Sequence, residues 1–289
     1  MKKTGLITLE YVNTVIKERD REIHKGDCGK VLVIAGSKGM AGAAVLCGKA
    51  AFRAGAGLVQ VSIEEELYPI IQIALPEATC VPRELSKLDL LAYDAIAIGP
   101  GLGDDAKNEG IIEHILTKYD KTVVLDADGL NTLAKSGKVH LIKQAVAAVI
   151  ITPHLGEAKR LIPKERTLAE WPKSERFSCE DRLKVTQMLL EETGAIVVLK
   201  GAGTIVASDK EGTYTNTTGN PGMATGGSGD VLTGIVAALA GQTKSPWDSA
   251  KAGVFIHGMA GDLAAEATGE FGMTAMDIAH MTAFVFKNK

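Results

Sequence analysis

The segment Gly222-Met223-Ala224-Thr225-Gly226-Gly227-Ser228-Gly229-Asp230 combines residue types that could bind and transfer a phosphate group. Four of its eight residues before the carboxylate are glycines, and glycines let backbone N–H groups turn toward a ligand. A helix is predicted directly afterwards, over residues 231–240. The start of a helix carries unpaired N–H groups and about half a positive charge. The pattern therefore predicts an anion site suited to phosphate at Gly226-Gly227-Ser228-Gly229-Asp230.

Asp230 needs a separate explanation, because a carboxylate at an anion site repels phosphate. One hypothesis is chemical: Asp230 takes the proton of a hydroxyl group next to the phosphoryl group being transferred. The alternative is that Asp230 only caps the helix. Capping accounts for Asp230 but not for the glycines that precede it.

Two further glycine-rich turns carry weaker signals. The run Gly99-Pro100-Gly101-Leu102-Gly103 follows a predicted strand and precedes a helix. It lacks the full G-x-G-x-x-G spacing of a dinucleotide-binding turn, and a tight strand-to-helix turn explains it equally well. The run Gly36-Ser37-Lys38-Gly39 lacks the G-K-[ST] offset of a nucleotide-binding P-loop.

Two polar segments are predicted at the ends of strands. In the first, Thr152 is expected as the N-cap of a helix and Pro153 as its first residue, which directs His154 toward a ligand. A structural role for His154 is the alternative. In the second, Lys200 precedes Gly201-Ala202-Gly203-Thr204, where a lysine could reach a phosphate as a point charge. A solvated lysine in a hairpin turn is the alternative.

Acidic and small residues supply the remaining candidates. Asp126 and Asp128 could hold Mg²⁺ through water or bind a sugar hydroxyl, although Asp128 could equally cap a following helix. Ala43 and Ala44, with the small residues of the run Arg53-Ala54-Gly55-Ala56-Gly57, permit close approach to a ligand or simply tight packing between a helix and a sheet.

The elements that must position these residues alternate along the chain. Strands are predicted at residues 31–35, 58–63, 95–98, 122–125, 147–151, 196–199, 204–208 and 213–216. Helices are predicted at residues 41–54, 108–118, 180–193, 231–240, 249–267 and 274–287. Apolar strands alternating with helices predict an α/β fold of three layers (αβα), in which helices cover both faces of a mostly parallel sheet. The strands at 204–208 and 213–216 are expected to form an antiparallel hairpin at one edge.

The predicted site residues follow the carboxyl ends of strands. Gly36, Gly99, Asp126, His154 and Lys200 all lie there. Ligands of such sheets bind at that edge, so the coincidence predicts one shared site.

Composition narrows the class of protein. The chain has 289 residues, 46% hydrophobic and 23% charged, with a net charge of −3. These values indicate a globular protein and give no basis for nucleic-acid binding. Cys28, Cys47, Cys80 and Cys179 are widely spaced, which argues against a zinc site or disulfide framework. No signal peptide or membrane-length apolar run is visible, so no membrane partner and a cytoplasmic location are expected.

One domain over residues 1–289 is predicted, with residues 1–25 as a short N-terminal extension. Residues 163–178 contain two prolines, a tryptophan and several charges. About 15 residues is short for a linker between domains, so this stretch is interpreted as a surface excursion.

Taken together, the motifs resemble the ribokinase-like superfamily, and within it the ADP/ATP-dependent NAD(P)H-hydrate dehydratases. The similar segments are residues 29–37, 98–103, 125–128, 152–157, 198–201, 226–230 and 232–234. The resemblance implies that a nucleotide, ADP or ATP with Mg²⁺, phosphorylates the ring hydroxyl of the S-epimer of hydrated NADH or NADPH. Loss of phosphate then restores the reduced cofactor, which makes the enzyme a lyase that repairs a metabolite.

The resemblance also assigns roles to residues. Asp230 would be the catalytic base and would contact the hydrated cofactor together with Ala43, Gly103 and His154. The adenine nucleotide would be bound by Lys200, Gly201, Ala202, Gly203, Thr204, Gly227, Ser228 and Gly229. No metal ligands are assigned. Ser228 stands where many relatives carry threonine, which keeps a hydroxyl group.

Other expectations and rival functions remain. A separate epimerase acting on the same substrate pool is expected as a partner, and a homo-oligomer is expected. The first rival is a ribokinase-like kinase that phosphorylates a vitamin-precursor alcohol and releases the product. A nucleotide sensor would not need Asp230, and a hydride-transferring dehydrogenase is disfavoured because its fingerprint is incomplete.

Overall fold

The computed structural model describes residues 3–174 and 176–286. Ten strands form one sheet in the order β1-β10-β9-β8-β7-β6-β5-β2-β3-β4. Neighbouring strands run parallel, except that β9 is antiparallel to both β8 and β10. Their bounds are β1 Thr4–Leu6, β2 Lys30–Ile34, β3 Leu58–Ile63, β4 Thr79–Pro82, β5 Ala95–Ile98, β6 Thr122–Leu125, β7 Ala148–Ile151, β8 Ile196–Leu199, β9 Ile205–Ser208 and β10 Gly212–Thr215.

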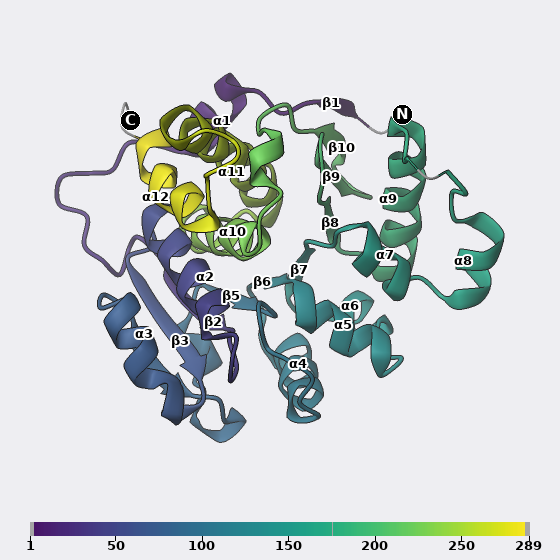
Figure 1. The fold of residues 1–289 in the computed structure, drawn as a ribbon. Helices are drawn as coiled ribbons and strands as arrows, with labels where there is room; N and C mark the ends of the chain where they lie inside the picture. The colour runs from purple at the N-terminus through teal and green to yellow at the C-terminus, as the bar shows by residue number, and fades with distance from the viewer. Residues whose placement is uncertain (1–2, 175, 287–289) are drawn as a thin grey trace.

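Helices cover both faces of this sheet, as Figure 1 shows. One face carries α2 (Ala41–Arg53), α10 (Ser228–Thr243), α11 (Pro246–Thr268) and α12 (Ala275–Val285). The other carries α4 (Lys107–Lys118), α5 (Ala127–Lys135), α6 (His140–Lys143), α7 (Leu155–Leu161) and α9 (Cys179–Thr193). Shorter helices lie nearer the rim: α1 (Leu9–Val15), α3 (Tyr68–Ala74) and α8 (Lys164–Glu170). The predicted three-layer αβα architecture is confirmed.

Two separate hydrophobic cores result from the alternation of side chains along each strand. In β2, Val31 and Val33 pack into the core beneath α2 and α10. Leu32 and Ile34 face the opposite core, beneath α4 and α5. All four side chains are buried, which explains why the central strands read as unbroken apolar runs and not as alternating ones.

The chain changes direction across the sheet between β2 and β5. From β2 it proceeds outward through β3 and β4, then returns to β5 and continues the other way through β6, β7 and β8. Past the carboxyl ends of the two strands, Gly36 N–H donates to Pro100 O at 2.8 Å. Such a switch point opens a crevice in which α/β proteins bind ligands.

Most predicted elements are confirmed, with shifts at their ends. The helix expected from Val231 begins three residues earlier, so Ser228 and Asp230 lie in its first turn. The hairpin of β9 and β10 is not at the edge as expected, because β1 pairs parallel to β10 outside it. The surface excursion at 163–178 contains the helix α8, and β4 and α3 also had no sequence prediction.

A buried lysine attaches the first residues of the chain to the rest. The ammonium group of Lys251, on α11, lies 3.7 Å from the ring centre of Tyr11, 4.5 Å from that of Tyr214 and 4.9 Å from that of Trp247. Cation–π contacts of a desolvated lysine are stabilising. They join α1, β10 and α11, so residues predicted as an extension contribute both a strand and a packed helix.

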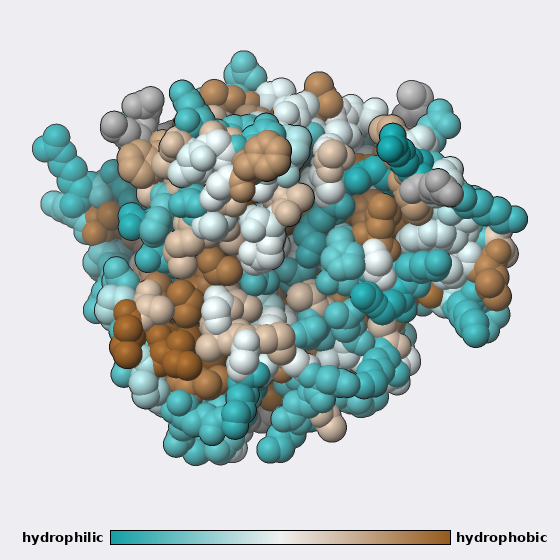
Figure 2. Space-filling view, viewed as in Figure 1, coloured by the Kyte–Doolittle hydropathy of each residue, from teal (hydrophilic) through white to brown (hydrophobic). Residues whose placement is uncertain are grey.

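The surface is mixed in character. Within the described ranges, no helix has the length and apolar composition needed to cross a membrane. Figure 2 shows hydrophobic colour over α3, where Ile70 and Ile73 are 47% and 83% exposed. Hydrophilic residues dominate the face around α5, α7 and α8 in the same view.

The contact between α2 and α10 gives a test of the packing. A Cβ added at Gly234 would lie 2.1 Å from Cys47 O, on the backbone of α2. Gly234→Ala should therefore force the helices apart and lower the free energy of unfolding by about 2–3 kcal/mol. Gly110→Ala is the control, since its Cβ would have no neighbour within 4 Å in α4. It should raise the free energy of unfolding by about 0.5–1 kcal/mol. Urea titration measures both, and equal effects of the two changes would contradict the assigned packing.

Candidate active site

A buried ion pair lies at the centre of the carboxyl edge of the sheet. Asp126, just after β6, accepts a hydrogen bond at 2.7 Å from Nζ of Lys200, which follows β8. Its other oxygen accepts one at 2.7 Å from the Thr233 hydroxyl on α10. Burial lowers the pKa of Lys200, but Asp126 and Glu157 outweigh it and raise the pKa overall. Lys200 is therefore a charged group within the site, and the alternative of a solvated lysine is wrong.

Glu157 extends this cluster to α7. Its carboxylate lies 3.6 Å from Lys200 Nζ and accepts a hydrogen bond at 2.8 Å from the backbone N–H of His154. His154, and not Thr152, is the N-cap of α7: its Nδ1 accepts from the N–H groups of Gly156 at 2.9 Å and Glu157 at 3.3 Å. Thr152 is buried, and its hydroxyl has no hydrogen-bond partner within residues 3–174 and 176–286. The helix expected to begin at Pro153 begins at Leu155.

The start of α10 has the features of an anion site. Its N-cap is Gly227, in a left-handed conformation with φ 90° and without a side-chain cap. Within the described part of the chain, the N–H groups of Gly227, Gly229 and Asp230 donate no hydrogen bond. Unpaired N–H groups at the positive end of a helix favour a bound anion. Asp230 does not cap this helix, so the capping alternative is wrong.

Gly229 lies beside the ion pair. A Cβ at this position would be 3.3 Å from Lys200 Nζ and 3.7 Å from Asp126 Oδ2. A longer side chain would therefore enter the space between the helix start and the ammonium group. Glycine keeps that space open, and an anion there would meet the backbone N–H groups and the charge of Lys200 together.

The environment of Asp230 allows its carboxylate to accept a proton near neutral pH. Burial raises the pKa of Asp230 to about 7, with Asp126 adding to the rise and Lys200 opposing it. Across residues 3–174 and 176–286, no group donates a hydrogen bond to its carboxylate. A general base is most effective when its pKa lies near the working pH.

His257, which has only a weak claim from the sequence, lies beside the start of α10. It projects from α11, with Nε2 3.4 Å from the Ser228 hydroxyl. Burial lowers the pKa of His257 to about 4. The ring is therefore neutral at physiological pH and can orient the Ser228 hydroxyl without adding charge beside Lys200.

The turn from β8 to β9 holds the other residues predicted to bind nucleotide. Gly201 and Gly203 have φ of 140° and 64°, and the Thr204 hydroxyl donates to Gly201 O at 2.9 Å. Arg182 on α9 supports this turn from behind, donating to Leu199 O at 3.1 Å and to Gly203 O at 3.5 Å. Lys200 and Gly229 bring the turn close to the start of α10, whereas Ala202 is exposed at its tip.

The residues predicted to contact the cofactor flank the crevice between β2 and β5. A Cβ built at Gly101 would lie 2.8 Å from Cβ of Ala43, and one at Gly103 would lie 3.1 Å from Oγ of Ser37. Gly103 N–H donates to Asp128 at 2.9 Å, so Asp128 fixes this turn and does not cap a helix. His154 lies on the α7 side of the same edge, with its side chain 53% exposed.

Sequence reasoning missed three supporting residues. Glu157 appeared only as the end of a motif, and Arg182 lay inside a predicted helix without a signal. Arg83 follows β4 and donates to Ala35 O at 2.8 Å and to Gly36 O, which holds the loop after β2. The signal for these residues would have been their burial next to glycine-rich turns, and burial cannot be seen in a single sequence.

The described residues do not form a metal site by themselves. They contain no group of three or more histidine, cysteine or acidic side chains that could hold an ion. Asp126, the best-placed carboxylate, is already bonded to Lys200 and Thr233. A magnesium ion would fit only in the mode where substrate phosphates supply most of its ligands.

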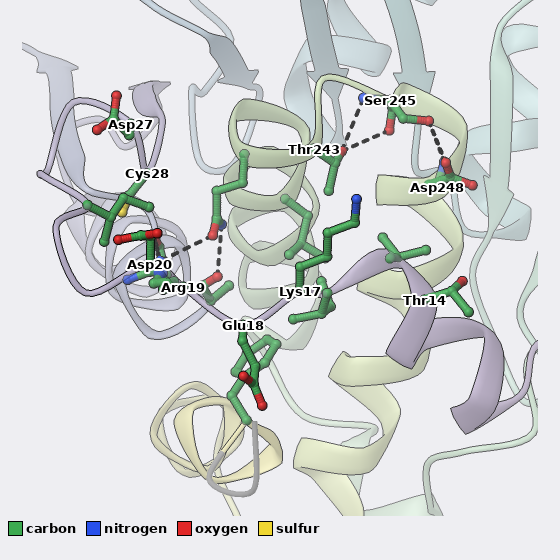
Figure 3. A pocket seen from close by; sticks show the side chains of 18 of the residues that line it. Thr14, Lys17, Glu18, Arg19, Asp20, Asp27, Cys28, Thr243, Ser245 and Asp248 are labelled. Carbon is green, nitrogen blue, oxygen red and sulfur yellow. Dashed lines mark hydrogen bonds between the residues drawn. The ribbon is translucent and has the colours of Figure 1, made fainter.

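A large cavity lies elsewhere, as Figure 3 shows. Its volume is about 1090 Å³, and it lies between the segment with Lys17 and Arg19 and the end of α10 at Gln242 and Thr243. Since α10 has 16 residues, this cavity is about 24 Å from the helix start. Arg19 donates to Gln242 at 3.2 Å across it, and it contains none of the predicted site residues.

Comparison with known proteins identifies the family. The family model for NAD(P)H-hydrate dehydratases matches residues 31–283. The chain belongs to the NAD(P)H-hydrate dehydratase family. The match includes every residue predicted for the site, from Ala43 to Asp230.

Individual members of the NAD(P)H-hydrate dehydratase family agree with this assignment. The chain is 38% identical to an ADP-dependent (S)-NAD(P)H-hydrate dehydratase from Neisseria meningitidis, covering 92% of this chain and 87% of that one. The structure of the ADP/ATP-dependent enzyme from Bacillus subtilis, co-crystallised with ATP and Mg²⁺, is 30% identical over 98% of both chains, with a TM-score of 0.82. A ribokinase-like superfamily protein from Enterococcus faecalis is 26% identical with a TM-score of 0.82, covering 99% of this chain and 96% of that one. The predicted ribokinase-like fold is thereby confirmed.

Other relatives are longer. They are named bifunctional NAD(P)H-hydrate repair enzymes, and the chain spans about half of their length.

Arg182 gives a test of the predicted nucleotide turn. Arg182→Ala removes the donors that hold residues 199–203, so the dissociation constant for ADP should rise by about tenfold. Arg182→Lys should recover only part of the affinity, because lysine cannot donate to several carbonyl groups in one plane. Isothermal titration calorimetry measures the affinity. Arg176→Ala, at an exposed position, is the control for loss of charge; an equal loss of affinity there would rule out a specific role for Arg182.

Proposed function

We propose that this chain catalyses the nucleotide-dependent dehydration of the S-epimer of hydrated NADH or NADPH, acting as a lyase that repairs the cofactor. The observation that carries the proposal is a carboxylate, Asp230, with a pKa raised to about 7 in the first turn of an uncapped helix. Family membership supports the reaction type. The position of Asp230 beside the uncapped start of α10 supports a base next to a bound phosphate.

The first step is a phosphoryl transfer. The ring hydroxyl of the hydrate attacks the terminal phosphorus of ADP or ATP while Asp230 takes the hydroxyl proton. A new O–P bond forms, the terminal bridging P–O bond of the nucleotide breaks, and AMP or ADP leaves. Charge that develops on the phosphoryl oxygens is stabilised by the N–H groups of Gly227 and Gly229, an electrostatic contribution that needs no rearrangement during the reaction.

The second step is an elimination. The carbon–oxygen bond to the new phosphate breaks and phosphate leaves with the electron pair, a proton passes from the neighbouring ring carbon to water, and the double bond of the reduced nicotinamide is restored. Phosphate is a better leaving group than hydroxide, which explains why a nucleotide is consumed in a dehydration. We propose that Ala43, Gly103 and His154 hold the hydrated ring next to Asp230 during both steps.

The nucleotide is proposed to lie along the turn at Lys200, Gly201, Ala202, Gly203 and Thr204, with its terminal phosphate at Gly227, Ser228 and Gly229. Lys200 keeps a positive charge at the phosphate end. Mg²⁺ would enter with the nucleotide, held mainly by its phosphates, and would neutralise their charge.

Several further expectations accompany the proposal. A cytoplasmic location, assembly into a homo-oligomer and a separate epimerase acting on the same pool of hydrates stay predictions. That residues 1–289 work as one catalytic domain is likewise proposed. The kinase that releases a phosphorylated vitamin precursor is less well supported, because the matching family and the named relatives are dehydratases.

The reaction itself gives the first test. The purified chain is mixed with hydrated NADH or NADPH, Mg²⁺ and either ADP or ATP, and the absorbance at 340 nm is followed. A nucleotide-dependent rise is expected, and Asp230→Asn should slow it by a factor of about 10²–10⁴ because the base is lost. Asp120→Asn, at an exposed position, is the matched control and should keep the wild-type rate. Absence of any rise would favour the kinase, and an unchanged rate in Asp230→Asn would remove Asp230 as the base.

The pH dependence gives a second test. Asp230 must be unprotonated to act, so kcat/KM should rise with pH through a midpoint at about 7. The charge of Lys200 lowers the pKa of Asp230, so Lys200→Met should move the midpoint to higher pH, whatever it does to the maximal rate. His257 stays neutral over this range and should not contribute. A midpoint that stays in place, or moves to lower pH, in Lys200→Met would contradict the assignment.

A further inference from the structure

A second cavity lies on the opposite side of the sheet from α10, among α5, α6, α7 and α8. Its volume is about 880 Å³, within the usual size range of small-molecule sites. It is lined by the last turns of α5 and α7 and by the beginnings of α6 and α8. The elements that form it are labelled together in Figure 1.

The lining is strongly basic, although the whole chain is acidic. Lys135, Lys159, Arg160 and Lys164 border the cavity, and among the residues that the structure describes they face one carboxylate, that of Glu192. Lys135 is paired with Asp104 at 2.6 Å, and Lys159 lies 5.9 Å from the ring centre of Trp171. Within the described ranges, Lys159, Arg160 and Lys164 form no ion pair. Three cationic side chains around one cavity attract an anion.

The inner wall differs in character from the rim. Val139, Leu161 and Ile162 are buried apolar residues that border the cavity. Asn131 also lines it, and its buried side-chain oxygen has no hydrogen-bond partner among the described residues. A ligand that fits must therefore combine an anionic group with an apolar part, and a polar group on it could satisfy the Asn131 amide.

We propose that this cavity binds a small organic phosphate. Its phosphate would be held by Arg160 and Lys164, where a guanidinium offers two parallel donors, and its apolar part would lie against Leu161 and Ile162. The site is distinct from the anion site at the start of α10, because none of its lining residues belongs to the ion-pair cluster or to the predicted nucleotide turn.

The two sites are nevertheless connected through α5. Asn131 donates to Asp128 at 3.5 Å, and Asp128 accepts from the N–H of Gly103 at 2.9 Å. A ligand that engages Asn131 would thus contact a residue two hydrogen bonds away from the turn predicted to hold the substrate.

The test uses phenyl phosphate as the probe, titrated calorimetrically into the whole chain with ADP at saturating concentration to fill the nucleotide site. Binding is expected, and Arg160→Ala/Lys164→Ala should raise the dissociation constant at least about tenfold. Lys118→Ala/Lys184→Ala removes the same charge at exposed positions outside the cavity and should stay within about twofold of wild type. Inorganic phosphate should bind more weakly than phenyl phosphate because it lacks the apolar part.

Equal affinities of the two double variants would overturn the proposal, as would the absence of binding to the wild-type chain. Equal affinity for inorganic phosphate would overturn the role of the apolar wall. Thermal melting checks that the variants are folded, and Arg160→Gln provides a milder change in which the same direction of effect is expected. None of these outcomes depends on the reaction catalysed at Asp230.

Discussion

The candidate site at the carboxyl edge of the sheet depends on one buried ion pair, between Asp126 and Lys200. Removing both charges from water is costly, and such a pair is tolerated only when every oxygen and proton has a partner. Thr233 and Glu157 supply the partners here. As a result, β6, β8, α7 and α10 meet at fixed positions. The same cluster tunes Asp230: burial is the main cause that raises the pKa of Asp230, Asp126 adds to the rise, and Lys200 limits it.

The start of α10 differs from the starts of several other helices in how its N–H groups are satisfied. Helices α7, α9 and α12 each begin with a capping box, and α11 is capped by Ser245. By contrast, α10 begins at a glycine with free N–H groups. Unsatisfied donors lower the stability of the free protein. A bound phosphate would satisfy these donors, so binding should raise the free energy of unfolding.

Much of this could be predicted from the sequence, because strand positions and glycine-rich turns are local signals. The alternation of apolar strands and helices predicted the layers, and the glycines before Asp230 marked the candidate anion site. The network could not be predicted, since Asp126 is 74 residues from Lys200 and 107 from Thr233. The sequence prediction placed the N-cap of α7 at Thr152 on residue preference alone. In the structure the Thr152 hydroxyl is buried, and His154 is the N-cap instead. The edge strand β1 has three exposed residues and no apolar pattern, so no local signal announced it.

That edge strand has a consequence for how the chain reaches its native state. Thr4 pairs with Thr213, so the contact closes a loop of roughly 200 residues, and contacts this distant in sequence form slowly. During synthesis on the ribosome, β1 emerges before the other strands of this sheet, yet its partner β10 is made only after the eight strands β2 to β9. The contacts of Lys251 with aromatic rings also form late, because Tyr11 and Trp247 are far apart in the sequence. The first strand of this sheet to be translated is therefore among the last to be fixed in place.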